Sequence, residues 1–187
     1  MSLAAVDTAG ALSFGPEHLP VLDEALYVAE HCCADYFRYA GKGWKELRFE
    51  LGTRRQLAPA ERSRRALAKL ARYEADDPLP WGPRHLWRIC LQDGAILSLA
   101  RRDGLNLLGL LTYVLTHELV HIVRFSRFEQ LFQAPPRQWG QEERLVHSLT
   151  HDVLGPLSRK PGLAPVMARY EGLGLSGCWI PESIRRL

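Results

Sequence analysis

Residues 104–128 read GLNLLGLLTYVLTHELVHIVRFSRF, and this stretch decides the fold. Apolar residues surround every polar position in it, which is typical of a central helix buried on all sides. Only about a dozen residues precede His117, and Asn106, Thr112 and Thr116 interrupt them, whereas a membrane span needs around 20 predominantly apolar residues. The stretch therefore predicts a core helix, and no membrane span is expected.

An H-E-x-x-H motif, His117-Glu118-Leu119-Val120-His121, lies inside this helix. Residues four apart share one helix face, so both imidazoles can reach one Zn²⁺ while Glu118 stands beside the remaining coordination position. Histidine and glutamate are costly in an apolar helix unless they have partners. A metal ion explains all three together, whereas the competing interpretation is two core histidines with a locally hydrogen-bonded glutamate.

A third protein ligand is needed for a zinc hydrolase of this type, together with one open position for water. Residues 141–156, QEERLVHSLTHDVLGP, predict a second helix that ends at a Gly-Pro pair. Glu143, His147 and His151 recur every four residues and form one polar stripe, whereas Glu142 lies on the apolar face. We predict Glu143 as the ligand. Glu142 and His147 remain alternatives, because a shift of one residue rotates a helix by about 100°.

The two helices together resemble the thermolysin-like gluzincin metallopeptidases, in which a glutamate on a following helix completes an H-E-x-x-H site. The resemblance covers residues 111–151. It implies Zn²⁺ bound by His117, His121 and Glu143, with Glu118 as general base. His147 stands where many members carry an aspartate, so it is expected to support a ligand or to contact the transition state. The implied fold is a compact zincin-like α+β domain, with a small antiparallel sheet and the motif helix packed on the ligand-bearing helix.

The resemblance also implies a chemistry. Water activated by the metal would attack a peptide or amide carbonyl, while Glu118 takes its proton and returns it to the leaving amine. Candidates for the donor that stabilises the transition state are His147, His151 and Tyr113. The expected function is a small, soluble, zinc-dependent metallopeptidase-like hydrolase acting on a peptide or protein. The alternative is a non-catalytic zinc-binding regulatory or interaction module on the same scaffold, in which a fourth protein ligand closes the site.

The rest of the chain bounds this setting. With 187 residues, of which 47% are hydrophobic, residues 1–187 are expected to form a single domain. No basic start followed by an apolar segment occurs in residues 1–20, which favours a cytoplasmic protein. The cysteines show no C-x-x-C spacing and are expected to be reduced thiols; they are Cys32, Cys33, Cys90 and Cys178.

Periodicity also predicts the elements before the motif. A helix is expected from residue 16 to a stop at residues 41–43, a strand within residues 44–56, and a basic amphipathic helix over residues 59–74. The Asp-Gly pair at residues 93–94 predicts a hairpin of strands 85–91 and 95–101. By the gluzincin resemblance, Ile96 to Ala100 would be the sheet edge that binds an extended substrate.

Charge offers little evidence for other partners. The net charge is only +3, and acids are interspersed among the arginines of residues 54–72. A solvated surface is therefore expected there, and nucleic acid is not an expected partner. Arg124 and Arg127, which directly follow the motif, are expected to pair with acids or to bind a substrate carboxylate.

Overall fold

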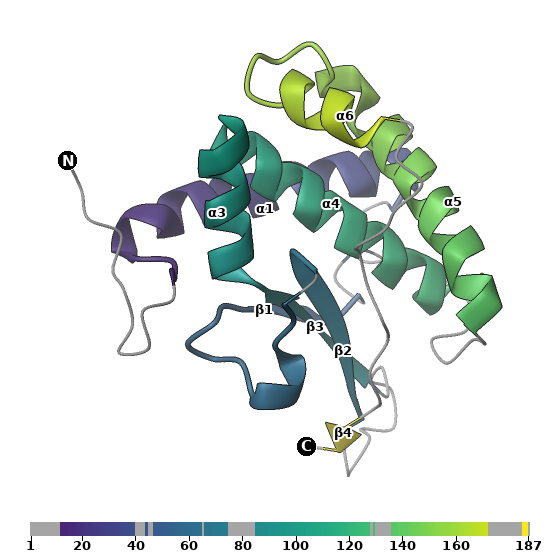
Figure 1. Ribbon diagram of the computed structural model, residues 1–187. Helices are drawn as coiled ribbons and strands as arrows, with labels where there is room; N and C mark the ends of the chain where they lie inside the picture. Colours follow the sequence, from purple (N-terminus) through teal and green to yellow (C-terminus); the bar gives the residue numbers. More distant parts are fainter. Residues whose placement is uncertain are drawn as a thin grey trace.

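The computed structural model describes residues 12–39, 44, 47–64, 66–74, 85–127, 129, 136–171 and 185–186. Over these ranges the chain is an α+β fold whose helices pack on one face of a small sheet (Figure 1). The helices are α1 (Leu19–Tyr36), α3 (Asp93–Asp103), α4 (Leu107–Ser126), α5 (Pro136–Leu154) and α6 (Ala164–Tyr170), with the short turns η1 (Pro16–His18), η2 (Pro59–Glu61) and η3 (Gly155–Leu157). The strands are β1 (Phe49–Gly52), β2 (Ala68–Glu74), β3 (His85–Leu91) and β4 (Arg185–Arg186).

The sheet is mixed, with the strand order β1-β3-β2-β4. Strand β3 lies inside the sheet, antiparallel to β2 along seven residue pairs and parallel to β1 along four. The two-residue β4 pairs with β2 only at Tyr73 and Glu74. The sheet is therefore mixed, and not antiparallel throughout as was expected: only the β2–β3 pair is antiparallel, and it is not the predicted hairpin, while β1 and β4 add parallel pairings.

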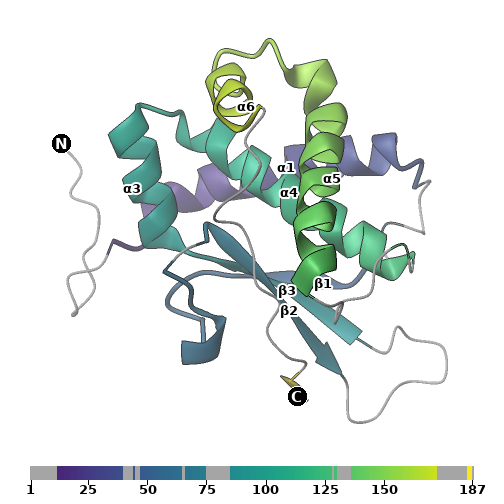
Figure 2. The same cartoon turned by 45° about the vertical axis from the view of Figure 1, so that its right-hand side comes forward.

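Helix α4 forms the centre of the core, as the sequence predicts. Asn106 caps its first turn by accepting a hydrogen bond from the Gly109 amide at 3.0 Å. Every residue from Gly109 to Phe125 is buried. Figure 2 shows α4 between the sheet and helix α1, with α5 and α6 beside it. The helix is long and apolar enough to cross a membrane, and 89% of its apolar window is buried inside the protein, as in a core helix.

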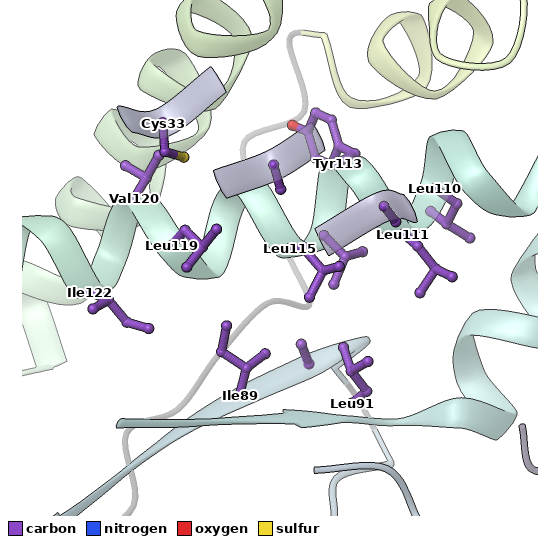
Figure 3. Packing of buried hydrophobic residues seen from close by; sticks show 14 of the residues in the cluster. Cys33, Ile89, Leu91, Leu110, Leu111, Tyr113, Leu115, Leu119, Val120 and Ile122 are labelled. Carbon is purple, nitrogen blue, oxygen red and sulfur yellow. The ribbon is translucent and has the colours of Figure 1, made fainter. Parts of the chain in front are cut away.

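Side chains of the sheet and of helix α1 pack against α4 from its two sides. Figure 3 shows Leu115 and Leu119 of α4 above Ile89 and Leu91 of β3, and Cys33 of α1 on the opposite side. All five side chains have no exposed surface. Burial of an aliphatic side chain of this size contributes about 1.5–3 kcal/mol relative to exposure. The layers therefore hold α4 rigidly, which is what a site built on this helix requires.

Two predicted elements are wrong. Residues 59–74 do not form a basic helix: η2 ends at Glu61, and residues 68–74 form β2, because pairing with β3 along the whole strand outweighs the helical period. The second strand of the hairpin is helix α3. The Asp93 carboxylate accepts hydrogen bonds from the backbone amides of Phe14 and Arg54, at 2.9 and 3.0 Å, instead of making a turn.

Because α3 is a helix, Ile96 to Ala100 cannot be a sheet edge that binds substrate. Ile96, Leu97 and Ala100 form its buried face at helical spacing. The predictions for α1, β1, β3, α4 and α5 are confirmed, although α1 ends at Tyr36 and the glycine-rich stop at residues 41–43 lies outside the described residues. Three cysteines are free thiols, Cys32, Cys33 and Cys90, while Cys178 lies outside the described residues.

Candidate metal centre

The two histidines of the motif meet a glutamate at the contact between α4 and α5. His121 Nε2 lies 3.2 Å from one carboxylate oxygen of Glu143, and His117 Nε2 lies 3.5 Å from the other. The two imidazole rings are 4.8 Å apart and nearly perpendicular. All three side chains are buried. The structure therefore brings together the three residues for which the sequence predicts a shared metal ion.

A neighbouring ion pair sets the rotation of α5. Arg124, about one turn after His121, donates to both carboxylate oxygens of Glu142, at 2.6 and 2.9 Å. A third donor of the same guanidinium binds Glu129 at 2.8 Å. Because Glu142 is held by this fork, the next residue, Glu143, faces the motif histidines. The expected pairing of Arg124 with acids is confirmed, and it separates the two glutamates that the sequence left open.

Arg127, the second arginine expected to bind an acid, mainly contacts Phe37 and Tyr39, which follow α1. Its guanidinium donates to the Phe37 carbonyl at 2.8 Å and lies over the Tyr39 ring, 4.7 Å from the centroid. Nη1 of Arg127 also lies 4.0 Å from a carboxylate oxygen of Glu129, a long ion pair. Arg127 thus ties the end of α4 to the segment after α1 and lies apart from the metal centre.

His147 adjoins two of these three residues, His117 and Glu143. Donor atoms of His117, Glu143 and His147 all lie within 4.8 Å of one another, a spacing that one metal ion can bridge. The His147 ring is 4.3 Å from the His117 ring. Its Nδ1 lies 2.8 Å from the Tyr113 hydroxyl, one turn before the motif on α4. The imidazole is therefore held from one side, and its other nitrogen is left available to a metal ion.

Several polar atoms of this cluster are buried without a hydrogen bond. Within the described part of the chain, these are Nε2 of His117, both carboxylate oxygens of Glu143, and Nε2 of His147. The Glu143 contacts are close, yet they lack hydrogen-bond alignment, as expected where lone pairs point at a common centre instead of at each other. Buried polar atoms normally find partners. Imidazole nitrogens and a carboxylate suit Zn²⁺, so the donor set fits this ion.

The electrostatics of the cluster follow from burial and from mutual contact. Burial lowers the pKa of His117. Burial also lowers the pKa of His147, to about 3. Burial alone would raise the pKa of Glu143, but its contacts with His117 and His121 hold it well below the usual range. Burial would likewise lower the pKa of His121, and the Glu143 carboxylate raises it instead. Glu143 is thus an anion, and His117 and His147 are neutral, the states in which these groups bind metals.

Glu118 occupies a different environment from Glu143. Burial raises the pKa of its carboxyl to about 7. Among the described residues its Oε2 has no hydrogen-bond partner. A carboxyl whose pKa lies near neutrality can both accept and release a proton under physiological conditions.

A pocket reaches this side of the cluster. Its lining comprises Leu67, Ala68, Tyr113, Val114, His117, Glu118, His147 and Tyr170. Glu118 and His147 therefore share the pocket with one motif histidine. Strand β2 contributes its first residue, Ala68, and α6 contributes Tyr170. The sequence did not indicate either wall, because residues 59–74 carry a helical period and Tyr170 lies far from the motif.

His151, the last residue of the predicted polar stripe, lies beside the cluster. Its ring packs edge-on against Tyr113, with the centroids 5.7 Å apart. Among the residues that the structure describes, the group of donor atoms that one ion could bridge comprises His117, Glu143 and His147, and neither His151 nor His121 belongs to it. The stripe thus brings Glu143 and His147 to the cluster and leaves His151 one turn beyond it.

Comparisons with known proteins add no further support: no family model, no curated protein and no solved structure matches this chain. The gluzincin resemblance therefore stays with the motif and its spacing. Any function has to be argued from the cluster and pocket themselves.

Proposed function

We propose that this chain is a zinc-dependent hydrolase of the metallopeptidase type, with a zincin-like arrangement of its two central helices. The observation that carries the proposal is the convergence of His117 and His121 on the two carboxylate oxygens of Glu143, at 3.5 and 3.2 Å, where neither Nε2 of His117 nor the Glu143 carboxylate makes a hydrogen bond to a described residue. Core histidines paired for stability alone would make aligned hydrogen bonds, as Arg124 and Glu142 do one turn away. The three donors would hold the metal.

The chemistry follows from the residues on the pocket side. Zn²⁺ in such a site acidifies water and polarises a carbonyl oxygen. Glu118 would take the proton from the attacking water and return it to the leaving amine, and its pKa near 7 suits both steps. His147 and Tyr113, which also line the pocket, are the groups able to contact the oxygen of the substrate.

An extended peptide is the substrate class that the surroundings favour. The pocket wall includes Leu67 and Ala68 at the start of β2. Ala68 pairs with Leu91 of β3 on one side, and within the described residues β4 pairs with β2 only at Tyr73 and Glu74, at the other end of the strand. A peptide could add to a strand by main-chain hydrogen bonds. The start of β2 therefore takes the role that the sequence had assigned to Ile96 to Ala100.

The test is Glu118→Gln, which keeps size and hydrogen bonding but cannot take up a proton. Zinc content should be unchanged, and hydrolysis of a broad peptide library should fall by at least about 10²-fold. His117→Ala is the matched comparison, because it should lose both zinc and activity. Full activity in zinc-loaded Glu118→Gln would refute the proposed role of Glu118.

A zinc-binding module without catalysis is the second candidate, and His147 is the observation that favours it. Structural zinc sites close all four positions with protein ligands, and His147 offers a fourth donor next to His117 and Glu143. Wild-type protein that binds one zinc ion per chain but cleaves nothing in the library would decide for this module.

A further inference from the structure

We propose that His147 is a fourth protein ligand of the metal when no substrate is bound, that Tyr113 holds it in this position, and that a substrate carbonyl must displace it. The inference rests on the metal site of the proposed function and adds its regulation. In this arrangement the resting site is closed, and His147 and the substrate compete for one coordination position.

The first support is the placement of the ring. The centroid of His147 lies 4.3 Å from that of His117, while the two motif histidines are 4.8 Å apart. Two imidazoles bound to one tetrahedral zinc at about 2.0–2.1 Å have ring centres roughly 5 Å apart. His147 therefore lies as close to His117 as His121 does, and its donor atom lies within bridging distance of Glu143.

The second support is the way in which the ring is held. Metal-bound histidines usually hydrogen-bond through the nitrogen that does not face the metal. Nδ1 of His147 contacts the Tyr113 hydroxyl at 2.8 Å, and Tyr113 itself stacks on Tyr170 at 4.7 Å between ring centroids. Nε2 is buried and has no hydrogen bond to any described residue. One nitrogen is thus anchored, and the other is left available to a metal ion.

The third support is the position of His147 relative to the pocket. His117, Glu118 and His147 line it, whereas His121 and Glu143 are not among the lining residues. A substrate in the pocket would therefore lie beside His147, Glu118 and His117. His147 belongs to α5, so its displacement by a carbonyl oxygen would leave the two motif histidines of α4 in place.

If His147 instead donated a hydrogen bond to the transition state, its two nitrogens would exchange their protonation states. As a donor to the transition state it would carry its proton on Nε2 and accept a hydrogen bond from Tyr113. As a metal ligand it keeps a lone pair on Nε2 and donates from Nδ1 to the Tyr113 oxygen. The number of imidazoles bound to the metal separates these roles without any measurement of activity.

The experiment is proton NMR of the full chain loaded with Co²⁺ in place of Zn²⁺. Each imidazole bound through Nε2 gives one exchangeable, paramagnetically shifted Nδ1–H signal. We expect three such signals in the wild type, two in His147→Gln, and three in the matched control His151→Gln. Two signals in the wild type, unchanged in His147→Gln, would overturn the proposal.

A second measurement tests the competition. Acetohydroxamate, a small chelating ligand with a carbonyl oxygen, should bind the metal-saturated His147→Gln variant more tightly than the wild type. The gain should equal the closed-to-open ratio of the resting site, at least about tenfold if the closed form dominates. Equal affinity in the two proteins would contradict displacement of His147.

The outcomes separate this inference from the proposed function. Three signals with no hydrolysis of any peptide would leave the fourth ligand standing and refute the enzyme. Two signals with hydrolysis that depends on Glu118 would do the reverse, and a chain that binds no metal would refute both. If His147→Gln does not fold, the wild-type count still decides. Tyr113→Phe should then keep three signals while zinc affinity falls roughly 10–100-fold.

Discussion

Two adjacent glutamates on α5 should show different roles when each is replaced by glutamine: Glu142→Gln should mainly lower stability, and Glu143→Gln should mainly lower zinc affinity. Glu142 is paired with Arg124, and both side chains are about 90% or more buried. Removing one partner of a buried ion pair costs about 3–5 kcal/mol. Arg124 keeps its contact with Glu129 at 2.8 Å, so the loss for Glu142→Gln should lie near the lower end, about 3 kcal/mol, in the metal-free protein.

Glu143→Gln should destabilise the metal-free protein less than Glu142→Gln does, because its carboxylate makes no aligned hydrogen bond to any described residue, although its contacts with His117 and His121 lower its pKa and so contribute some stability. Zinc affinity should instead fall by more than about 100-fold, the upper range for a residue that only supports a ligand. Glu142→Gln should weaken zinc binding far less. Each glutamate thus carries one function that its neighbour lacks.

The assays are urea denaturation in the presence of a chelator, and zinc competition with a chromophoric chelator for the folded proteins. The slope of unfolding free energy against urea should be the same in both variants, so that midpoints report stability. The reasoning about α5 is wrong if Glu142→Gln loses zinc more severely than Glu143→Gln, or if Glu142→Gln is as stable as the wild type without metal.

Two further predictions test the surroundings of the site. A Cβ added at Gly109 would lie 1.9 Å from the Gly162 carbonyl oxygen, so Gly109→Ala should lower the unfolding free energy by about 1–3 kcal/mol despite the better helix propensity of alanine. The control is Gly155→Ala, where nothing lies within 4 Å of the added Cβ. Equal thermal midpoints for the two variants would contradict the expected clash at Gly109. For Glu61, burial alone would raise the pKa, but hydrogen bonds from Tyr73 and a backbone amide lower it below its ordinary value. The contribution of Glu61 to stability is therefore present above that ordinary pKa and is lost as the pH falls through the folded-state pKa. Glu61→Gln should accordingly make the free energy of unfolding fall less steeply with pH below about pH 4.5. The same dependence of the urea midpoint on pH in the variant and the wild type would refute this role of Glu61.

The sequence predicts helix α4 well and the sheet only in part, for a physical reason. The apolar density around residues 107–126 leaves no exposed face, so burial follows from composition alone. Residues 68–74 have a helical period in their sequence but form a strand, because they pair with β3. The local sequence pattern carries no information about this pairing. Asp93 likewise binds amides 79 and 39 residues earlier in the chain. Such long-range contacts are invisible in a window of neighbouring residues.

The candidate site divides in the same way. The spacing of His117 and His121 on one helix is a local property, and the sequence contains it completely. The choice between Glu142 and Glu143 depends on Arg124 of another helix, 18 residues earlier in the chain. The contact of Tyr113 with His147 spans 34 residues and joins two helices. Only the packing of α4 against α5 reveals these two contacts.

The contact between α4 and α5 buries charge in two different ways within two helical turns. Arg124 and Glu142 neutralise each other through aligned hydrogen bonds, at 2.6 and 2.9 Å. Two turns earlier on α4, the donors of His117 and Glu143 come close without such alignment, and within the described residues they find no other hydrogen bond. A chain selected for stability alone would use the first solution at both turns, or apolar side chains of similar volume. The zinc ion that we propose would make the second arrangement favourable, because it would accept the converging lone pairs at once.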